Sequence, residues 1–232
     1  MNLMPKDGWS LVSGTCGGLF YSKLMRFIDG YLLGMTRTIL PDSVVFDAGA
    51  GNGNFGIEAA KAGAKLVCTI ENNPKMIEKI NSTRLLLPNP DRVRVIERNF
   101  YDGVISELAK ENRPRIIHFR RCLYREDDAI INVLKESYDA LLPGGYIFVI
   151  QAERDNRLFD DDGFGRVALD HVLKRATFSF NSWFKDHHHR RFSREELEHL
   201  CLSACPFSEI EHLPKSRPAY HFIAMKKTSI QL

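Results

Sequence analysis

The chain has 232 residues and a mass of 26.5 kDa, the size of one α/β domain with a sizeable appendage. Hydrophobic residues make up 44% and charged residues 26%, which excludes a disordered chain. No window approaches about 18 uninterrupted apolar residues, so neither a membrane-spanning helix nor a membrane partner is expected. The net charge of +3 permits a nucleic-acid partner without indicating one.

The first residues are followed by no apolar stretch of the kind that a secretory signal contains. The five cysteines form no C-x-x-C pair, and Cys68 lies in an apolar run typical of a core residue. Cys201 and Cys205 would share one face of a helix, but no other ligand type accompanies them. These features predict a reduced, cytoplasmic protein.

An amphipathic helix is expected within the first 40 residues, because apolar side chains recur there at spacings of three and four. The residues of this stripe are Phe20, Leu24, Phe27, Tyr31 and Met35, with Ile28 and Leu32 widening the same face. Pro41 and Asp42 end the pattern.

Beyond Pro41, strand-like and helix-like runs alternate. Strands are expected at 44–46, 66–70, 93–96, 116–119 and 146–150, and helices at 57–62, 74–87, 104–110 and 127–142. Regular alternation of this kind predicts a parallel sheet with helices on both faces. Residues 151–192 are rich in charge, aromatic rings and histidine, with a helix expected near 166–176. A capping box at Ser193 opens the next helix, and runs at 207–213 and 220–226 predict an antiparallel hairpin.

The most informative stretch is a glycine-rich turn. The first strand runs through Asp47 into Gly49, Gly51 and Gly53, and a helix follows. Backbone N–H groups of such a turn, with the helix N-terminus, can bind polar or anionic groups. Glu71 stands at the end of the second strand, where a carboxylate can accept both hydroxyls of a ribose.

Two cofactors fit this arrangement. The run from Gly51 to Gly56 satisfies the dinucleotide pattern G-x-G-x-x-G, with Glu71 at the spacing that NAD(P) binding requires. Asp47 argues against it, since it places a carboxylate close to the position of a pyrophosphate. The string D-A-G-A-G-N-G resembles motif I of the class I S-adenosylmethionine-dependent methyltransferases, commonly D-x-G-x-G-x-G. The resemblance extends from Ser43 to Lys227.

The resemblance implies a doubly wound α/β fold with a seven-stranded sheet in the order 3-2-1-4-5-7-6, the last strand antiparallel. N-terminal helices and a helical insertion after strand five would complete a single domain over residues 1–232. Its parts would be an N-terminal lid (1–40), a cofactor-binding core (41–150), an insertion that caps the acceptor (151–192), and a C-terminal helix and hairpin (193–232).

The same resemblance implies the site. Asp47 would support a cofactor loop made of Gly49, Gly51, Asn52 and Gly53. Glu71, with Asn72 beside it, would hold the ribose, and Arg120 lies where the family's chain passes the cofactor. Asn99 and Phe100 stand where the family often has the last two residues of G-D-F, flanking adenine. The carbonyl of Asn99 could accept the adenine amino group.

The segment from Phe119 to Asp128 resembles small-molecule O-methyltransferases, whose L-[KR]-[RN]-x-L-H-D-W ends in a histidine that acts as general base. Tyr124 takes that histidine's place, and a neutral phenol is a poor base near pH 7. Tyr124 would then orient the acceptor, or only pack. Because alignment supplies much of the rate of an in-line methyl transfer, activity does not require a base.

Three further groups invite a functional interpretation. His118 lies in an apolar run and is expected to be a core histidine. His187, His188 and His189 cannot all converge from a regular element, so no metal site is expected. The arginines near strand four would suit nucleic-acid phosphates or an anionic small molecule equally well.

The sequence therefore predicts an enzyme that transfers a methyl group from S-adenosylmethionine to a small-molecule acceptor, at oxygen, releasing S-adenosylhomocysteine. The alternatives are an RNA or DNA methyltransferase, a catalytically silent S-adenosylmethionine-binding subunit, and a dinucleotide oxidoreductase. The dimerisation domain usual in those O-methyltransferases has no counterpart in this chain, so either a monomer or a homodimer is expected.

Overall fold

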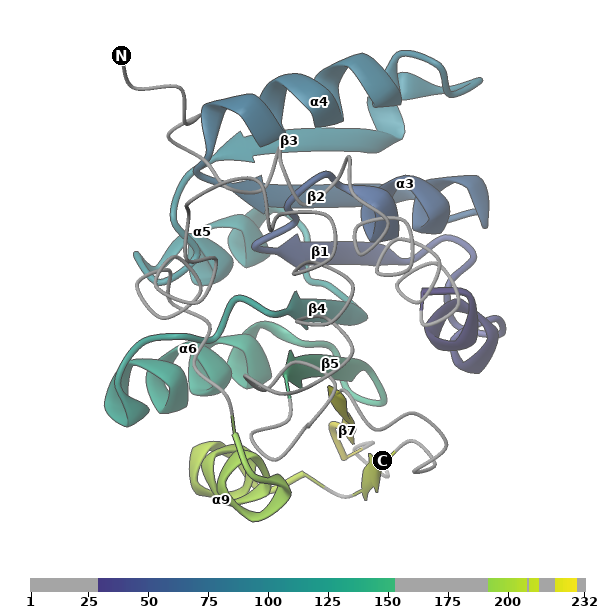
Figure 1. Ribbon diagram of the computed structural model, residues 1–232. Coiled ribbons are helices and arrows are strands. Elements are labelled where there is room, and N and C mark those ends of the chain that lie inside the picture. Colours follow the sequence, from purple (N-terminus) through teal and green to yellow (C-terminus); the bar gives the residue numbers. More distant parts are fainter. Residues whose placement is uncertain (1–28, 153–191, 208, 213–219, 229–232) are drawn as a thin grey trace, which may run out of the picture.

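The computed structural model describes residues 29–152, 192–207, 209–212 and 220–228 (Figure 1). Within these ranges seven strands form one sheet in the order β3-β2-β1-β4-β5-β7-β6. Strands β1 to β5 pair in parallel, and β7 is antiparallel to both of its neighbours. The strands are β1 (Val44–Ala48), β2 (Leu66–Glu71), β3 (Val93–Glu97), β4 (Ile116–Arg120), β5 (Tyr146–Ala152), β6 (Glu209–His212) and β7 (Tyr220–Lys226). The predicted fold class, strand order and antiparallel last strand are confirmed.

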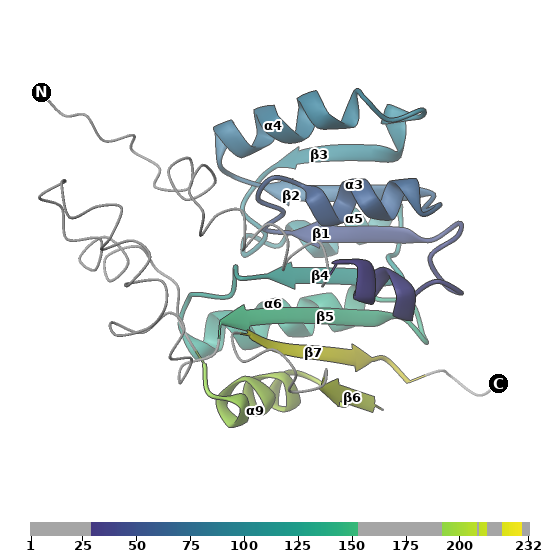
Figure 2. The same cartoon turned by 45° about the vertical axis from the view of Figure 1, so that its right-hand side comes forward.

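Helices cover both faces of this sheet (Figure 2). Helix α3 (Asn54–Lys61) and the helical residues 29–35 lie on one face, and α4 (Pro74–Arg84) runs beside β3. The other face carries α5 (Val104–Glu111), α6 (Asp127–Ala140) and α9 (Arg194–Ala204). Neighbouring residues of β1 enter opposite cores, Val45 beneath α3 and Phe46 beneath α5 and α6. Burial on both faces explains the nearly unbroken apolar runs of the central strands.

Several element boundaries differ from the sequence-based expectation. Helix α3 begins three residues earlier than predicted, at Asn54. Helix α4 ends at Arg84, short of the predicted Leu87, because Pro88 disfavours helical backbone in the residue before it. Strand β5 is two residues longer than predicted because its end pairs with β7.

Part of the expected architecture falls outside the described residues. Tyr31 and Met35 of the predicted N-terminal stripe lie in the helical stretch 29–35, where Leu32 is buried. Phe20, Leu24 and Phe27 lie outside, as do the helix expected at 166–176, the triple histidine and nearly all of the predicted insertion. No helix of the described part combines the length and apolar character needed to cross a bilayer.

The predicted capping box at the start of α9 is confirmed. The Ser193 hydroxyl accepts a hydrogen bond from the Glu196 N–H at 3.2 Å, and the Glu196 carboxylate accepts one from the Ser193 N–H at 2.8 Å. Two backbone donors at the helix N-terminus are thereby satisfied. Helix α9 therefore begins at Ser193, and its buried residues pack in the same core as those of α6.

Helix α3 approaches β2 closely at Gly56. A Cβ added to this glycine would lie 2.7 Å from Cγ2 of Thr69 and 3.1 Å from Cγ1 of Val67, both in β2. The first distance is shorter than Cβ contacts in proteins and the second is tight, so a side chain at position 56 would force its neighbours in β2 to shift. The close packing fixes how far the start of α3 stands from the sheet, and hence the width of the glycine turn.

We predict that Gly56→Ala destabilises the protein by about 1–3 kcal/mol through overpacking, although alanine favours a helix over glycine by about 1 kcal/mol. Urea unfolding measures the change. Gly34→Ala is the matched control, since a Cβ there meets nothing within 4 Å and position 34 is helical. The control should leave the protein equally stable or more stable. Equal stability of Gly56→Ala and wild type would contradict the close contact.

Candidate active site

The candidate site lies where the strand order reverses. From β1 the chain proceeds to β2 and β3 on one side, and β4 and β5 lie on the other. In open α/β sheets ligands bind beyond the carboxyl ends of the strands at such a switch point. The predicted site residues lie at or just beyond the carboxyl ends of β1, β2, β3 and β4, so the sheet brings all of them to one edge.

The glycine turn after β1 is fastened to the end of β2. The N–H groups of Gly49 and Ala50 both donate to the carbonyl of Ile70, at 2.9 and 3.1 Å, and the Gly53 N–H donates to Ala50. All three glycines have positive φ, between 56° and 72°. Such φ values favour glycine, so the turn can form only with residues of this kind at these positions.

The surroundings of the three glycines differ. A Cβ at Gly49 would lie 2.6 Å from Cβ of Cys122, and one at Gly53 would lie 2.8 Å from Cγ1 of Ile80. A Cβ at Gly51 would meet no atom within 4 Å. Packing therefore closes the turn at both of its ends, and its middle borders open space.

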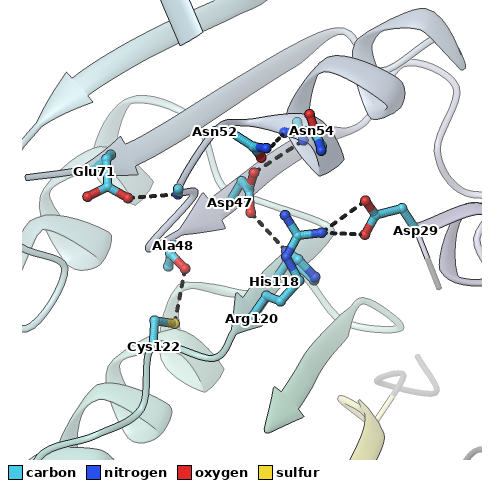
Figure 3. Close-up of polar contacts among 11 residues, drawn as sticks. Asp29, Asp47, Ala48, Asn52, Asn54, Glu71, His118, Arg120 and Cys122 are labelled. Atoms are coloured by element: carbon cyan, nitrogen blue, oxygen red, sulfur yellow. Dashed lines mark hydrogen bonds and ion pairs between the residues drawn. The ribbon is translucent and has the colours of Figure 1, made fainter. Parts of the chain in front are cut away.

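Asp47 fixes the helix side of the turn. Helix α3 has Gly53 as its N-cap, a residue without a side chain to accept a hydrogen bond. The Asp47 carboxylate takes this role from the neighbouring strand, since its Oδ2 accepts from the Gly56 N–H at 3.2 Å (Figure 3). A carboxylate near a helix N-terminus is also favoured by the helix dipole. This cap explains why α3 starts earlier than its own sequence indicates.

The second oxygen of Asp47 contacts His118 of β4. Oδ1 lies 2.8 Å from Nδ1 of His118, and both side chains are buried. The imidazole also stacks on the ring of Phe55 with 3.9 Å between the centroids. The structure thus places His118 in the core, as expected. Its Nε2 has no hydrogen-bond partner among the described residues.

Glu71 fixes the strand side of the turn. Its Oε2 accepts from the Gly51 N–H at 2.7 Å, and its Oε1 accepts from the N–H groups of Asn72 and Asn73 at 2.9 Å each. The carboxylate is almost fully buried. It is therefore held in one orientation beside the open middle of the glycine turn (Figure 3).

The segment after β3 packs against the glycine turn at Gly49. The side-chain oxygen Oδ1 of Asn99 accepts a hydrogen bond from the Tyr101 N–H at 3.1 Å, which makes a local turn. Phe100 is buried, its ring reaching the position that a Gly49 side chain would take. Asn52 makes a similar local bond to the Asn54 N–H. Asn99, Phe100 and Asn52 thus all lie at the predicted edge of the sheet.

At the end of β4, Arg120 is bound by a residue that the sequence analysis did not single out. Nη1 of Arg120 lies 2.8 and 2.9 Å from the two carboxylate oxygens of Asp29 (Figure 3). The exposed fractions of the two side chains are 10% and 2%. Burial raises the pKa of the Asp29 carboxyl above its usual value, whereas the charges of Arg120 and His118 act to lower it. Asp29 belongs to the helical stretch 29–35, so this bond joins that helix to the site.

Tyr124 follows β4 and is 42% exposed. Its ring meets the ring of Tyr101 edge-on at 6.2 Å, and the Arg125 guanidinium lies 4.7 Å above the ring of Tyr101. Burial raises the pKa of the Tyr124 phenol above its usual value. When the pKa of a phenol is raised, an even smaller fraction of it is ionised at neutral pH, so it is less able to accept a proton.

Two contacts of the site carry no signal in the sequence. Asp29 lies 91 positions from Arg120, and the Cys122 thiol donates to the carbonyl of Ala48 across 74 positions. No local pattern links such residues. The only hint is the place of Asp29, a carboxylate inside an otherwise apolar stripe.

Comparison with known proteins identifies the family. Residues 22–204 match a family model described as a methyltransferase domain. The chain belongs to this family. Together with the sheet order, the match confirms the expected class I methyltransferase family.

Solved structures resemble this methyltransferase in fold. The S-adenosylmethionine-dependent methyltransferase SibL, in its apo form, is 20% identical with a TM-score of 0.60, covering 97% of this chain and 63% of its own. An O-methyltransferase family protein from Burkholderia thailandensis is 12% identical with a TM-score of 0.62, covering 97% and 64%. Magnesium protoporphyrin IX methyltransferase from Synechocystis PCC 6803, with bound SAM, is 11% identical with a TM-score of 0.62, covering 97% and 93%. The chain thus spans less than two thirds of the length of the first two.

We predict that Asp47→Leu lowers the free energy of unfolding by about 2–4 kcal/mol, because two buried donors lose their acceptor. Asp47→Asn should cost clearly less, since its amide can accept from Gly56 and donate to the other tautomer of His118. Denaturant unfolding compares the two variants, whose side chains have the same number of non-hydrogen atoms. If the leucine variant is as stable as the asparagine variant, the hydrogen bonds of Asp47 do not stabilise the turn.

Proposed function

We propose that this methyltransferase transfers the methyl group of S-adenosylmethionine to an oxygen atom of a small-molecule acceptor. The observation that supports it most is the open middle of the glycine turn at Gly51, bordered by the fixed Glu71 carboxylate. Bound S-adenosylmethionine would supply a methyl group activated by its sulfonium. The chain's own residues would bind that cofactor, align the acceptor and exclude water.

The residues at the edge of the sheet fit this cofactor. The ribose would bind to Glu71 at the end of β2, and adenine would lie beside Asn99 after β3. Phe100 is buried beneath Gly49, so it would not flank adenine as the sequence led us to expect. Oε1 of Glu71 already accepts two N–H groups and Oε2 only one. We therefore infer that Oε2 receives one ribose hydroxyl, instead of the two hydroxyls expected from the sequence. The amino-acid end would then extend past Gly49, Gly51 and Gly53 toward β4.

The charges near the turn disfavour the dinucleotide alternative. Of the three carboxylates around the ends of β1, β2 and β4, Asp47 contacts His118 and Asp29 is paired with Arg120, whereas Glu71 borders the open middle of the glycine turn. A pyrophosphate would bring two further negative charges to this edge. S-adenosylmethionine brings a positive sulfonium and a positive ammonium, which acidic surroundings favour.

The contacts of the arginines near β4 favour a small acceptor over a nucleic acid. Arg113 donates to the carbonyls of Asp139, Ala140 and Leu141 at the end of α6. Arg120 is paired with Asp29. Arg113 is therefore a poor candidate for a phosphate contact, and Arg120 is largely buried at the cofactor edge of the sheet, so the RNA or DNA alternative has less support than the sequence alone gave it.

Tyr124 is proposed to orient the acceptor, because it is the exposed polar ring closest along the chain to the end of β4. Transfer to oxygen follows from the resemblance of residues 119–128 to O-methyltransferases. The capping role of the insertion, the monomeric or homodimeric state and the cytoplasmic location remain predictions. The four cysteines of the described part are free thiols, which agrees with a reducing compartment.

The cofactor proposal predicts that Glu71→Gln weakens S-adenosylmethionine and S-adenosylhomocysteine binding by roughly 10- to 100-fold, the worth of a hydrogen bond to a charged group. Calorimetry with both ligands and with NAD(P) measures it. Glu97→Gln is the matched control, since Glu97 pairs with Glu71 in the sheet register and is exposed. Binding of NAD(P) alone by the wild type would overturn the proposal. Binding of S-adenosylmethionine without turnover in any acceptor screen would favour the silent subunit.

The acceptor proposal predicts that Tyr124→Phe leaves S-adenosylmethionine affinity unchanged and lowers kcat/KM for the acceptor by less than about tenfold. Removal of a true general base costs about 100- to 10,000-fold. Steady-state kinetics, with the acceptor found by screening for S-adenosylhomocysteine release, decide between the two roles. A loss above 100-fold would assign Tyr124 to proton transfer.

A further inference from the structure

A buried ion pair closes the β4 side of the site. Asp29 and Arg120 are separated by 91 positions, yet one guanidinium nitrogen lies within 2.9 Å of both oxygens of the carboxylate. Removing such a pair from water costs free energy that geometry of this quality must offset. A surface pair would hold the helix to the sheet at a smaller desolvation cost.

The pair belongs to a larger charged cluster. Asp47 and His118 form a second buried contact two positions earlier on β4, on the same face of the sheet as Arg120. The charge of Arg120, and next that of His118, lowers the pKa of Asp29, and the charge of Asp47 raises it. Asp29 thus faces the same buried polar region that caps α3 and supports the glycine turn.

The order of the strands relates this cluster to the cofactor. With adenosine over the ends of β2 and β3, the amino-acid portion must point toward β1 and β4. Its carboxylate would need a cation, and a guanidinium is well suited to bind one. Arg120 stands at the end of β4, and its direction is set by the carboxylate on helix 29–35.

We propose that Asp29 is a positioning residue: it holds the Arg120 guanidinium at the end of β4, where that guanidinium serves the amino-acid portion of S-adenosylmethionine. The inference rests on the proposed function. It assigns to helix 29–35 a part in cofactor binding that no motif of the sequence carries.

The test compares two ligands on wild type and Asp29→Asn. One is S-adenosylmethionine, and the other is 5′-methylthioadenosine, which keeps the adenosine and the sulfur but lacks the amino-acid portion. In the variant, the Kd of S-adenosylmethionine should rise roughly tenfold, while that of 5′-methylthioadenosine should change by no more than about twofold. A role confined to stability would move both ligands alike.

Glu111→Gln is the matched control, because Arg94 and Glu111 form an exposed pair 2.7 Å apart. It should leave both affinities unchanged. Equal weakening of both ligands in Asp29→Asn, no change in either, or tighter binding of S-adenosylmethionine would each overturn the inference.

If Asp29→Asn does not fold, the same two ligands are measured on Asp29→Glu, which keeps the charge but lengthens the side chain by one methylene group. Weaker binding of S-adenosylmethionine alone supports the inference in this variant too. An unchanged ratio of the two Kd values overturns it. Failure of wild type to bind either ligand would instead contradict the proposed function.

Discussion

The site depends on one carboxylate, that of Asp47. It accepts the N–H that the glycine N-cap of α3 leaves without a partner, and it contacts the buried imidazole of His118. Strand β1, helix α3 and strand β4 therefore meet at one side chain. The glycine turn runs between the strand that carries Asp47 and the helix that Asp47 caps, so its position follows from this one residue.

Glu71 complements Asp47 from the other side. Asp47 binds the backbone after the turn, and Glu71 binds the middle of the turn and the start of the next connection. Each acid uses backbone N–H groups, which cannot rotate away as side chains do. The turn is therefore preorganised, and a ligand that binds it has little ordering entropy left to offset.

Sequence patterns predicted the sheet well because its central strands are buried on both faces and read as apolar runs between glycine and proline signals. They predicted the start of α3 poorly, because its cap is supplied by Asp47 on a strand and not by a neighbouring residue. The end of α4 was also missed, since a helical pattern continues through three leucines before Pro88 takes effect. Within the site, the glycine turn and Glu71 follow from spacing. The role of Asp29 does not follow from spacing, because its partner Arg120 lies 91 positions away and comes near it only in the folded sheet.

The separations along the chain also bear on how the site forms. Asp29 to Arg120, Asp47 to His118 and Ala48 to Cys122 span 91, 71 and 74 positions. All three contacts require β4 to pair beside β1, which happens after β2 and β3 have been made by the ribosome. Closing such long loops costs entropy before the contacts repay it. The hydrogen bonds of the glycine turn need only β1, α3 and β2, whereas the charged cluster around it also needs β4 at the centre of the sheet.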